Sequence, residues 1–402
     1  MKRILHVLHS FPPESRGGVE IYVERLARHQ RESGLEPLVL APTFHPESAG
    51  DQVVEGVRVL RVLASPPIGD AISDEDERIG HWTKELARLA PDIVHVHHWH
   101  GIGPFVSRAA RAVNARTVVT LHDLFTTCAL FFRLREDREL CSPELPAETC
   151  AACVAKSAGM PMESLVAAIP ERMRRYRAEL DAAHAIATLS RAQADYLAQV
   201  PELAGLDLSF SSFPTLEGIE PLERKPARTG PLRVATWGGL VPGKGLHLLA
   251  EAASKLPSGS LELHHHGPVL DEDYASAVRA LAGEVPLTLH GRFEPGELRD
   301  RLRDIDLAVH PSQFLETYGF TTDEALHFGL PVLVPDRGAP QERIGDRGAT
   351  FRVSDAGDLA DRLHELVEDP ARLERLRKGS PSQLVSWEEH AKALHSFYDL
   401  GP

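Results

Sequence analysis

Short apolar runs alternate with amphipathic stretches along most of the chain. An apolar run that enters a turn, followed by apolar residues three and four apart, predicts a β-strand and then an α-helix. Repeated alternation of this kind is typical of parallel sheets with right-handed crossovers and helices on both faces. The predicted strands are Arg3–His9, Pro37–Ala41, Arg58–Val62, Ile93–His97, Thr117–Leu121 and Ala185–Thr188, then Leu232–Trp237, Ser260–His265, Leu287–His290, Asp306–His310 and Pro331–Val334.

One stretch between the two groups of strands has no hydrophobic period. Residues 213–230 are rich in Pro, Gly and charge, which predicts a linker. A chain of 402 residues is long enough for a domain on each side of it. The expected organisation is an N-terminal domain over 1–212 with an insertion at 126–160, a C-terminal domain over 231–385, and a final helix over 386–402 that crosses back to the first domain.

Charge and hydropathy exclude some partners. A net charge of -14 disfavours nucleic acid and a broadly basic face docked on anionic lipid. A basic helical run at 171–177 is read as a solvated helix face. We expect no signal peptide after Met1 and no membrane span, because no apolar run approaches the roughly 18 residues that a bilayer requires. The expected location is the cytoplasm.

Two carboxylates bracket a turn behind the predicted strand Asp306–His310. The segment from Glu316 to Glu324 contains a glycine turn and opens a helical run. A strand that enters such a turn and then a helix aims backbone N–H groups at an anion. A carboxylate on each side of an anion suits a diphosphate ligand with hydroxyls at both ends, which describes a nucleotide sugar.

Two other strand ends carry glycines. Lys244 lies in a glycine-rich segment that leads into a helix, where an ammonium and free N–H groups act together on one phosphate. Gly17 and Gly18 follow the first strand, where paired glycines permit either close backbone approach to a ligand or a plain tight turn.

These segments together resemble the retaining GT-B glycosyltransferases of family 4. The strongest match is Pro311-Ser-x-x-x-Glu316-x7-Glu324, followed by Ala and then Gly-x-Pro-Val. The resemblance implies an α/β fold of two Rossmann-like, doubly wound parallel-sheet domains that face a cleft. One residue departs from the pattern: Gly239 stands where the family usually has an arginine that binds the diphosphate. Arg292 is a candidate substitute.

The resemblance also implies an activity, the transfer of a sugar from a nucleotide diphosphate sugar to an unidentified acceptor such as a glycoconjugate, polysaccharide or natural product. The sugar keeps its anomeric configuration, and no cofactor takes part in the chemistry. Glu316, His122 and Lys244 are the expected catalytic residues, with Asp123 fixing the ring of His122. The expected donor-binding residues are Gly17, Gly18, Gly239, Lys244, Gly319, Phe320, Thr321 and Glu324.

Two other functions fit the same fold. A protein without turnover that binds a nucleotide sugar is favoured only by the missing arginine at Gly239. A sugar phosphorylase would use phosphate in place of the acceptor. The acceptor, the donor base and the oligomeric state do not follow from the sequence.

Two sets of metal-ligand residue types are also present. Asp74-Glu-Asp76, Asp271-Glu-Asp273 and Asp304-Ile-Asp306 match a metal-binding Asp-x-Asp motif by letter, and we read all three as structural or solvated. The other set holds every cysteine of the chain and falls in the insertion. A structural zinc site, disulfides and unpaired thiols all stay open for these residues, Cys128, Cys141, Cys150 and Cys153.

Overall fold

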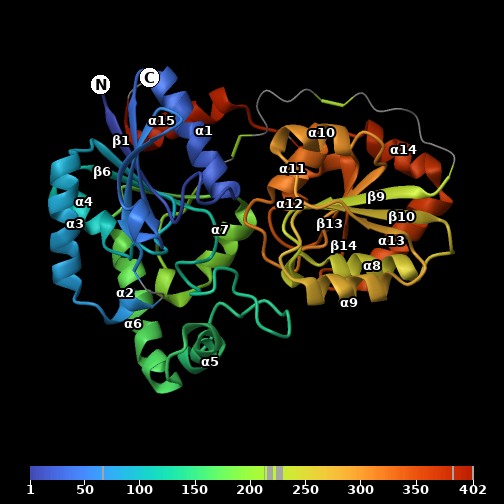
Figure 1. Cartoon of the computed structure of the whole chain (residues 1–402), viewed down its shortest axis with the longest axis horizontal. Helices are drawn as coiled ribbons and strands as arrows, with labels where there is room; N and C mark the ends of the chain where they lie inside the picture. The colour runs from blue at the N-terminus through green and yellow to red at the C-terminus, as the bar shows by residue number, and fades with distance from the viewer. Residues whose placement is uncertain (66–67, 212, 215–220, 223–229, 383, 401–402) are drawn as a thin grey trace. The chain divides into compact units, whose positions relative to one another are not determined.

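The computed structural model describes residues 1–402 except 66–67, 212, 215–220, 223–229, 383 and 401–402. The chain divides into two compact units, each built on an open sheet (Figure 1). The first unit comprises Met1–Arg133, Cys141–Ser211 and Ala391–Pro402, and the second comprises Leu134–Leu140 and Ser212–His390. The predicted linker at 213–230 falls largely outside the described residues.

The sheet of the first unit has the order β3-β4-β2-β1-β5-β6-β7-β8 and is parallel except for its β3 edge. The direction of winding reverses beside β1, which lies between β2 and β5. Ligands of doubly wound sheets bind at such a reversal, beyond the carboxyl ends of the strands. The strands are β1 (Arg3–Val7), β2 (Glu36–Thr43), β3 (Gly50–Val54), β4 (Val57–Leu63), β5 (Ile93–Val96), β6 (Arg116–Leu121), β7 (Ala185–Thr188) and β8 (Ser209–Phe210).

Burial explains the central strands of this sheet. All four residues of β5 are buried, as are the last seven of β2, because helices cover both faces of a parallel sheet. The antiparallel edge strand β3 was not predicted. It pairs with β4 because Glu55 and Gly56 both have positive φ values, 49° and 76°, as a two-residue hairpin turn requires.

The helices of the first unit begin with the turn after β1 and end with the last helix of the chain. Residues Ala391–Pro402, which include most of α15, belong to this unit, and Gln30 of α1 donates to the hydroxyl of Tyr398. The helices are α1 (Gly18–Glu32), α2 (Gly69–Ile72), α3 (Glu75–Leu89), α4 (Val106–Ala112), α5 (Ala147–Ala158), α6 (Met162–Asp181), α7 (Arg191–Ala198) and α15 (Trp387–Tyr398).

The second unit has the order β11-β10-β9-β12-β13-β14, and all its strands are parallel. Here the winding reverses between β9 and β12. Its strands are β9 (Leu232–Trp237), β10 (Leu261–His266), β11 (Leu287–Leu289), β12 (Leu307–Val309), β13 (Val332–Pro335) and β14 (Gly348–Phe351). Its helices are α8 (Leu246–Ser254), α9 (Glu272–Ala282), α10 (Leu298–Arg301), α11 (Phe320–His327), α12 (Pro340–Arg343), α13 (Ala356–Glu368) and α14 (Pro370–Lys378).

The fold expected from the resemblance is confirmed: the chain has two doubly wound α/β sheets whose strands are mostly parallel. The core of the second unit combines β9, β10 and β12 with the apolar faces of α8, α9 and α13. In the described parts of the chain, every helix is too short or too polar to traverse a bilayer.

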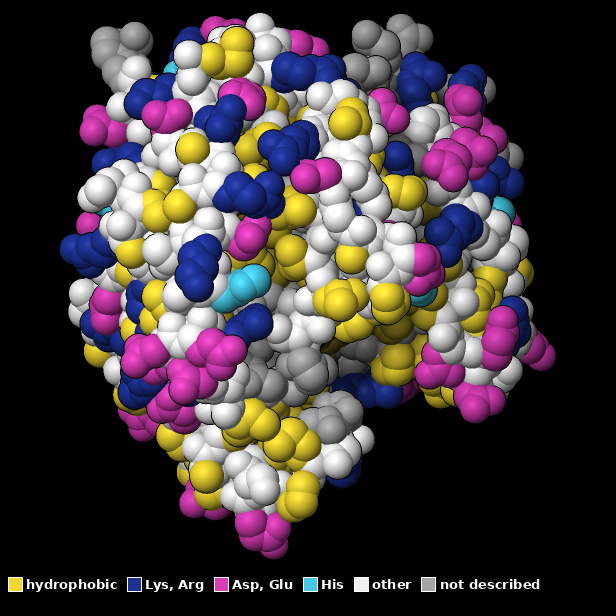
Figure 2. Space-filling view, turned by 60° about the vertical axis from the view of Figure 1, so that its left-hand side comes forward, with side chains coloured by type: hydrophobic (Ala, Val, Ile, Leu, Met, Phe, Trp, Pro, Cys, Tyr) yellow, Lys and Arg dark blue, Asp and Glu magenta, His cyan; other side chains and the backbone are white. Residues whose placement is uncertain are grey.

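The predicted insertion contains a helix with its own small core. Ala151 and Val154 of α5 pack with Leu165 and Ala168 of α6, and with Ile68. Apolar side chains gather on the lobe at the lower end of Figure 2, and basic and acidic side chains are interspersed over the rest of that face.

The prediction of a solvated helix face at 171–177 was wrong for two of its arginines. Arg172 and Arg175 are buried. The guanidinium of Arg172 donates to the Phe125 carbonyl and lies over the ring of Tyr176, with 4.3 Å from Cζ to the ring centroid. Arg172 therefore holds the start of the insertion against α6, and Arg175 instead donates to the Ser73 carbonyl.

Candidate functional site

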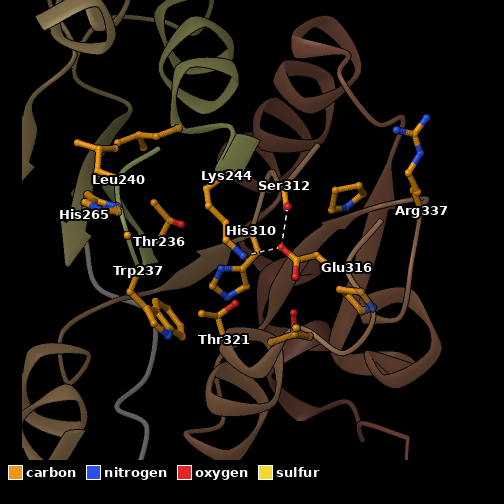
Figure 3. A pocket seen from close by; sticks show the side chains of 17 residues that line it. Thr236, Trp237, Leu240, Lys244, His265, His310, Ser312, Glu316, Thr321 and Arg337 are labelled. Atoms are coloured by element: carbon orange, nitrogen blue, oxygen red, sulfur yellow. Dashed lines mark hydrogen bonds and ion pairs between the residues drawn. The ribbon is translucent and has the colours of Figure 1, made fainter. Parts of the chain in front are cut away.

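A pocket opens in the second unit beyond the carboxyl ends of its strands (Figure 3). Its walls come from the ends of β9, β10, β12 and β13 and from the start of α11, so it lies where the winding of the sheet reverses. The lining residues are Thr236, Trp237, Gly238, Gly239, Leu240, Lys244, Leu246, His265, His310, Ser312, Glu316, Gly319, Thr321, Thr322, Pro335, Arg337 and Pro340.

Lys244 reaches this pocket from a 3-10 turn, Pro242–Lys244, at the start of α8. The next residue, Gly245, has a φ of 76° and packs so tightly that a Cβ atom would lie 1.9 Å from the Pro311 carbonyl oxygen. Only glycine fits that approach. The turn that carries Lys244 is therefore held directly against the segment after β12.

Lys244 and Glu316 form an ion pair at the centre of the pocket. The Lys244 Nζ atom lies 2.6 Å from Glu316 Oε1, and the Ser312 hydroxyl donates to the same oxygen at 2.7 Å (Figure 3). Burial opposes ionisation of Glu316, but the charge and hydrogen bond of Lys244, with the Ser312 hydroxyl, leave its pKa lowered. Glu316 is therefore a carboxylate at neutral pH.

A buried histidine lies beside this pair. Burial first, and the charge of Lys244 second, lower the pKa of His310 to about 3. Its imidazole is neutral at pH 7, so Lys244 supplies the positive charge on this side of the pocket.

Helix α11 presents its N-terminus to the pocket. Gly319, with a φ of 80°, precedes the helix and has no side chain to cap the first N–H groups. Thr321 and Thr322 line the pocket from this first turn. An uncapped helix N-terminus beside a lysine is a binding site for an anion.

Glu324 lies one turn further along α11. Its carboxylate accepts a hydrogen bond from the indole of Trp237 at 2.5 Å. Trp237 is the last residue of β9 and lines the pocket, whereas Glu324 and Phe320 do not line it. Glu324 therefore reaches the edge of the pocket through a residue that sequence reasoning did not select.

The second unit brings five of the predicted site residues together in one pocket. They are Gly239, Lys244, Glu316, Gly319 and Thr321. The predicted residues Gly17, Gly18 and His122 belong to the first unit.

Sequence reasoning missed one cation. Arg337 follows β13 and lines the pocket, whereas Arg292, the substitute that we considered for the missing arginine, does not line it. Arg337 donates to the Gln313 carbonyl at 3.4 Å. Its place just after a strand was the signal, because ligands bind beyond the carboxyl ends of parallel strands.

The expected partner of His122 was wrong. The Nε2 atom of His122 lies 3.0 Å from Nδ1 of His97, whereas Asp123 pairs with His98 Nε2 at 3.1 Å and accepts from the Phe125 amide. Consecutive residues at a strand end point to opposite faces of the sheet. His97 and His122 therefore meet on one face, and His98 and Asp123 meet on the other.

The Asp-x-Asp matches have structural roles, as the sequence analysis proposed. Asp74 caps α3 by accepting from the Glu77 amide, and Asp271 caps α9 by accepting from the Tyr274 amide. Asp306 accepts from the Arg233 amide and pairs with Arg377 at 2.6 Å.

The four cysteines are partly buried, and no disulfide joins them. Burial first, and the neighbouring Cys128 second, raise the pKa of Cys141 to about 11. Their sulfur atoms are not gathered within 4.8 Å of one another, whereas sulfurs around one zinc ion lie about 4 Å apart. The zinc site stays a prediction, which metal analysis of protein purified without chelator would check.

Family models match both halves of the chain. The model "Glycosyltransferase Family 4" matches residues 16–202, and the model "Glycosyl transferases group 1" matches residues 220–383. Among curated proteins, the chain is 25% identical to a glycogen synthase of Mycobacterium tuberculosis over 98% of this chain and 94% of that protein. It is 28% identical to D-inositol 3-phosphate glycosyltransferase 1 of Catenulispora acidiphila over 95% of this chain and 90% of that protein.

Solved structures share the fold. Sucrose-phosphate synthase from Thermosynechococcus elongatus superposes with a TM-score of 0.70 at 18% identity, over 100% of this chain and 99% of that one. Anabaena HepE in complex with UDP-glucose gives a TM-score of 0.64 at 16% identity, over 98% of this chain and 100% of that one.

Proposed function

The chain belongs to the GT-B glycosyltransferases of family 4, and on that premise we propose that it transfers a sugar from a nucleotide diphosphate sugar with retention of configuration. Curated relatives with names such as "GDP-mannose-dependent alpha-mannosyltransferase" support a nucleotide sugar as donor. The acceptor is a hydroxyl compound whose identity the relatives do not share, since the names of two of them point to glycogen and to inositol phosphate.

The ion pair between Lys244 and Glu316 is the observation that carries this proposal. In the free protein each charge neutralises the other at the pocket centre. When a nucleotide sugar binds, the two residues would bind different parts of it, because the diphosphate requires a cation and the sugar hydroxyls require hydrogen-bond acceptors. Lys244 and the first N–H groups of α11 would hold the diphosphate, and Glu316 would bind sugar hydroxyls.

The same arrangement suits bond breaking. As the bond from the sugar C1 atom to the diphosphate breaks, negative charge grows on the leaving oxygen and positive charge grows on the ring. We assign Lys244 to the first of these charges and Glu316 to the second. Attack by the acceptor on the same face would retain the configuration, and the leaving phosphate would take the acceptor proton.

Other predicted residues fill the remaining roles. We assign the ribose hydroxyls to Glu324, and the donor backbone contacts to Gly239 and to Phe320. We also assign Gly17 and Gly18 to the donor phosphate and His122 to the sugar. Arg337 is our candidate for the charge that the family usually places at Gly239.

A two-stage experiment tests the proposal. Thermal unfolding is measured against UDP-, GDP- and dTDP-sugars, and a donor at about 100 times its Kd should stabilise the protein by about 2.7 kcal/mol, or roughly 2–4 °C. The stabilising donor is then incubated with candidate acceptors, and NMR of the product reads its anomeric configuration. An inverted product contradicts retention, and stabilisation without turnover favours a binding protein. Turnover that requires phosphate in place of an acceptor favours a phosphorylase.

A further inference from the structure

A layer of polar side chains lies buried in the first unit on one face of its sheet. Neighbouring strands contribute His6 from β1, His95 and His97 from β5, and Thr120 and His122 from β6 and its end. All five are less than a tenth exposed. Two helices add buried side chains to this layer, Tyr22 and Gln30 from α1 and Tyr398 from α15.

Half of this layer forms a chain of hydrogen bonds between Gln30 and His122. His122 Nε2 lies 3.0 Å from His97 Nδ1, and His97 Nε2 lies 3.0 Å from His6 Nδ1. His6 Nε2 then lies 2.7 Å from the Oε1 atom of Gln30. His97 and His6 thus use both ring nitrogens within the chain.

The other half of the layer continues from Gln30. Its Nε2 atom donates to the Tyr398 hydroxyl at 3.3 Å, and that hydroxyl lies 2.7 Å from His95 Nδ1. His95 Nε2 lies 2.8 Å from the Thr120 hydroxyl. Gln30 is therefore the junction of the two halves, with its oxygen on one and its nitrogen on the other.

Burial favours the neutral form of the imidazoles in this layer. None of its eight side chains is a carboxylate, and an imidazolium is costly to bury without one. Burial lowers the pKa of His6 to about 4, against the opposing effect of its hydrogen bond to Gln30. A neutral imidazole has one N–H donor and one acceptor nitrogen, so the direction of one bond in the chain sets the direction of the next.

We propose that Gln30 is a positioning residue that fixes which ring nitrogen of His122 carries the proton. The Gln30 oxygen accepts from His6 Nε2, so His6 Nδ1 accepts from His97 Nε2, and His97 Nδ1 accepts from His122 Nε2. His122 Nδ1 is then the ring nitrogen without the proton. Turning the Gln30 amide over reverses every bond and places the proton on Nδ1. The consequence for sugar binding rests on the proposed function, whereas the proton order does not.

Part of this layer also has the spacing of a metal site. One ring nitrogen from each of His6, His95 and His97 lies within 4.8 Å of the others. Those imidazoles already use their nitrogens in hydrogen bonds to Gln30, Tyr398, Thr120 and each other, so an ion would have to replace bonds that are already made. Metal bound by these three histidines is therefore an outcome that counts against the proposal.

The proton order is tested by NMR on the full-length protein with ¹⁵N-labelled histidine. Long-range ¹H–¹⁵N spectra separate the two tautomers, and His122→Gln assigns the His122 signals. We expect the Nε2–H tautomer at His122, His97 and His6. A wild-type spectrum with Nδ1–H at His122 overturns the proposal, and so does a stoichiometric metal ion that His95→Ala loses and Cys150→Ser keeps.

Variants then test the role of Gln30. Gln30→Leu removes the acceptor and should give mixed tautomers at His122, with kcat about tenfold lower, the value of one hydrogen bond in the transition state. Thr120→Val is the matched control: it removes a buried hydroxyl from the same layer, keeps both hydrogen bonds of the Gln30 amide, and should leave the His122 tautomer unchanged. An unchanged tautomer in Gln30→Leu overturns the proposal.

The test separates this inference from the proposed function. The wild-type spectrum needs no donor, and it decides the proton order even where Gln30→Leu does not fold. Lys244→Ala should abolish most turnover while leaving the His122 tautomer as it was. If the wild-type protein turns over no nucleotide sugar but shows the expected tautomers, the proposed function fails and the proton order stands.

Discussion

The two units carry different chemistry at the carboxyl ends of their strands. In the first unit, neutral histidines bond to one another and to Gln30 in a closed layer. In the second unit, Lys244 and Glu316 form an ion pair in an open pocket. Hydrogen bonds between uncharged side chains fix which atom donates and which accepts. An ion pair can instead be separated by a ligand whose anionic group binds the cation and whose hydroxyls bind the carboxylate. The second unit therefore supplies the charged groups, and the first unit supplies hydrogen bonds of fixed direction.

The largest effect should follow the loss of Lys244. Lys244→Ala removes the cation that meets the leaving diphosphate, so kcat/KM should fall about 30- to 900-fold, or about 2–4 kcal/mol. Lys255→Ala is the matched control, because Lys255 is an exposed lysine on the same unit that pairs with Glu251. A fall of less than tenfold, measured by steady-state kinetics, would show that the second unit does not carry the charge.

Glu316→Gln tests the other half of the ion pair. The amide keeps the shape but loses the charge that would stabilise a positive sugar ring, so kcat should fall about a hundredfold, or roughly 2.7 kcal/mol. The donor KM should change much less, since that charge matters most in the transition state. Glu251→Gln serves as the control on an exposed carboxylate. A rise in KM with kcat unchanged would limit Glu316 to ground-state binding.

A smaller effect is expected at Glu324. Contacts to ribose are the same in the ground state and the transition state, so Glu324→Gln should raise the donor KM about tenfold and leave kcat nearly unchanged. The glutamine still accepts from the Trp237 indole, which separates ribose binding from the packing of β9 against α11. Equal losses in kcat for Glu324→Gln and Glu316→Gln would contradict the separate roles.

The smallest effect concerns stability and pH. The pKa of Glu316 is lowered in the folded protein, so ionised Glu316 contributes stability above its unfolded value of about 4.5. That contribution is lost as the pH falls through the folded pKa. Urea unfolding of wild type and Glu316→Gln should therefore show the wild type losing stability relative to the variant below about pH 4.5. A difference that stays constant across this range would contradict the lowered pKa.

Much of the fold could be predicted from the sequence because each central strand is buried on both faces. For β1, β9 and β13, the ends of the predicted apolar run lie within two residues of the ends of the strand. The short strands β8 and β14 were missed, because Ser209–Phe210 and Gly348–Phe351 are too short to show an apolar run.

Some residues of the candidate site could likewise be predicted from the sequence, and others could not. Lys244 and Glu316 were predicted because each stands in a local motif of turn and helix. Arg337, the pairing of His122 with His97, and Gln30 were not predicted. These depend on which strands and helices lie side by side, and no local pattern carries that information.

The position of Tyr398 near the end of the chain has a consequence for biosynthesis. Its hydroxyl binds Gln30 and His95, so the final helix completes an interior that otherwise consists of residues from the first half of the sequence. A ribosome releases the N-terminal residues first, and domains generally begin to fold in that order. Tyr398 can therefore join the histidine layer of the first unit only after the residues of the second unit have been synthesised.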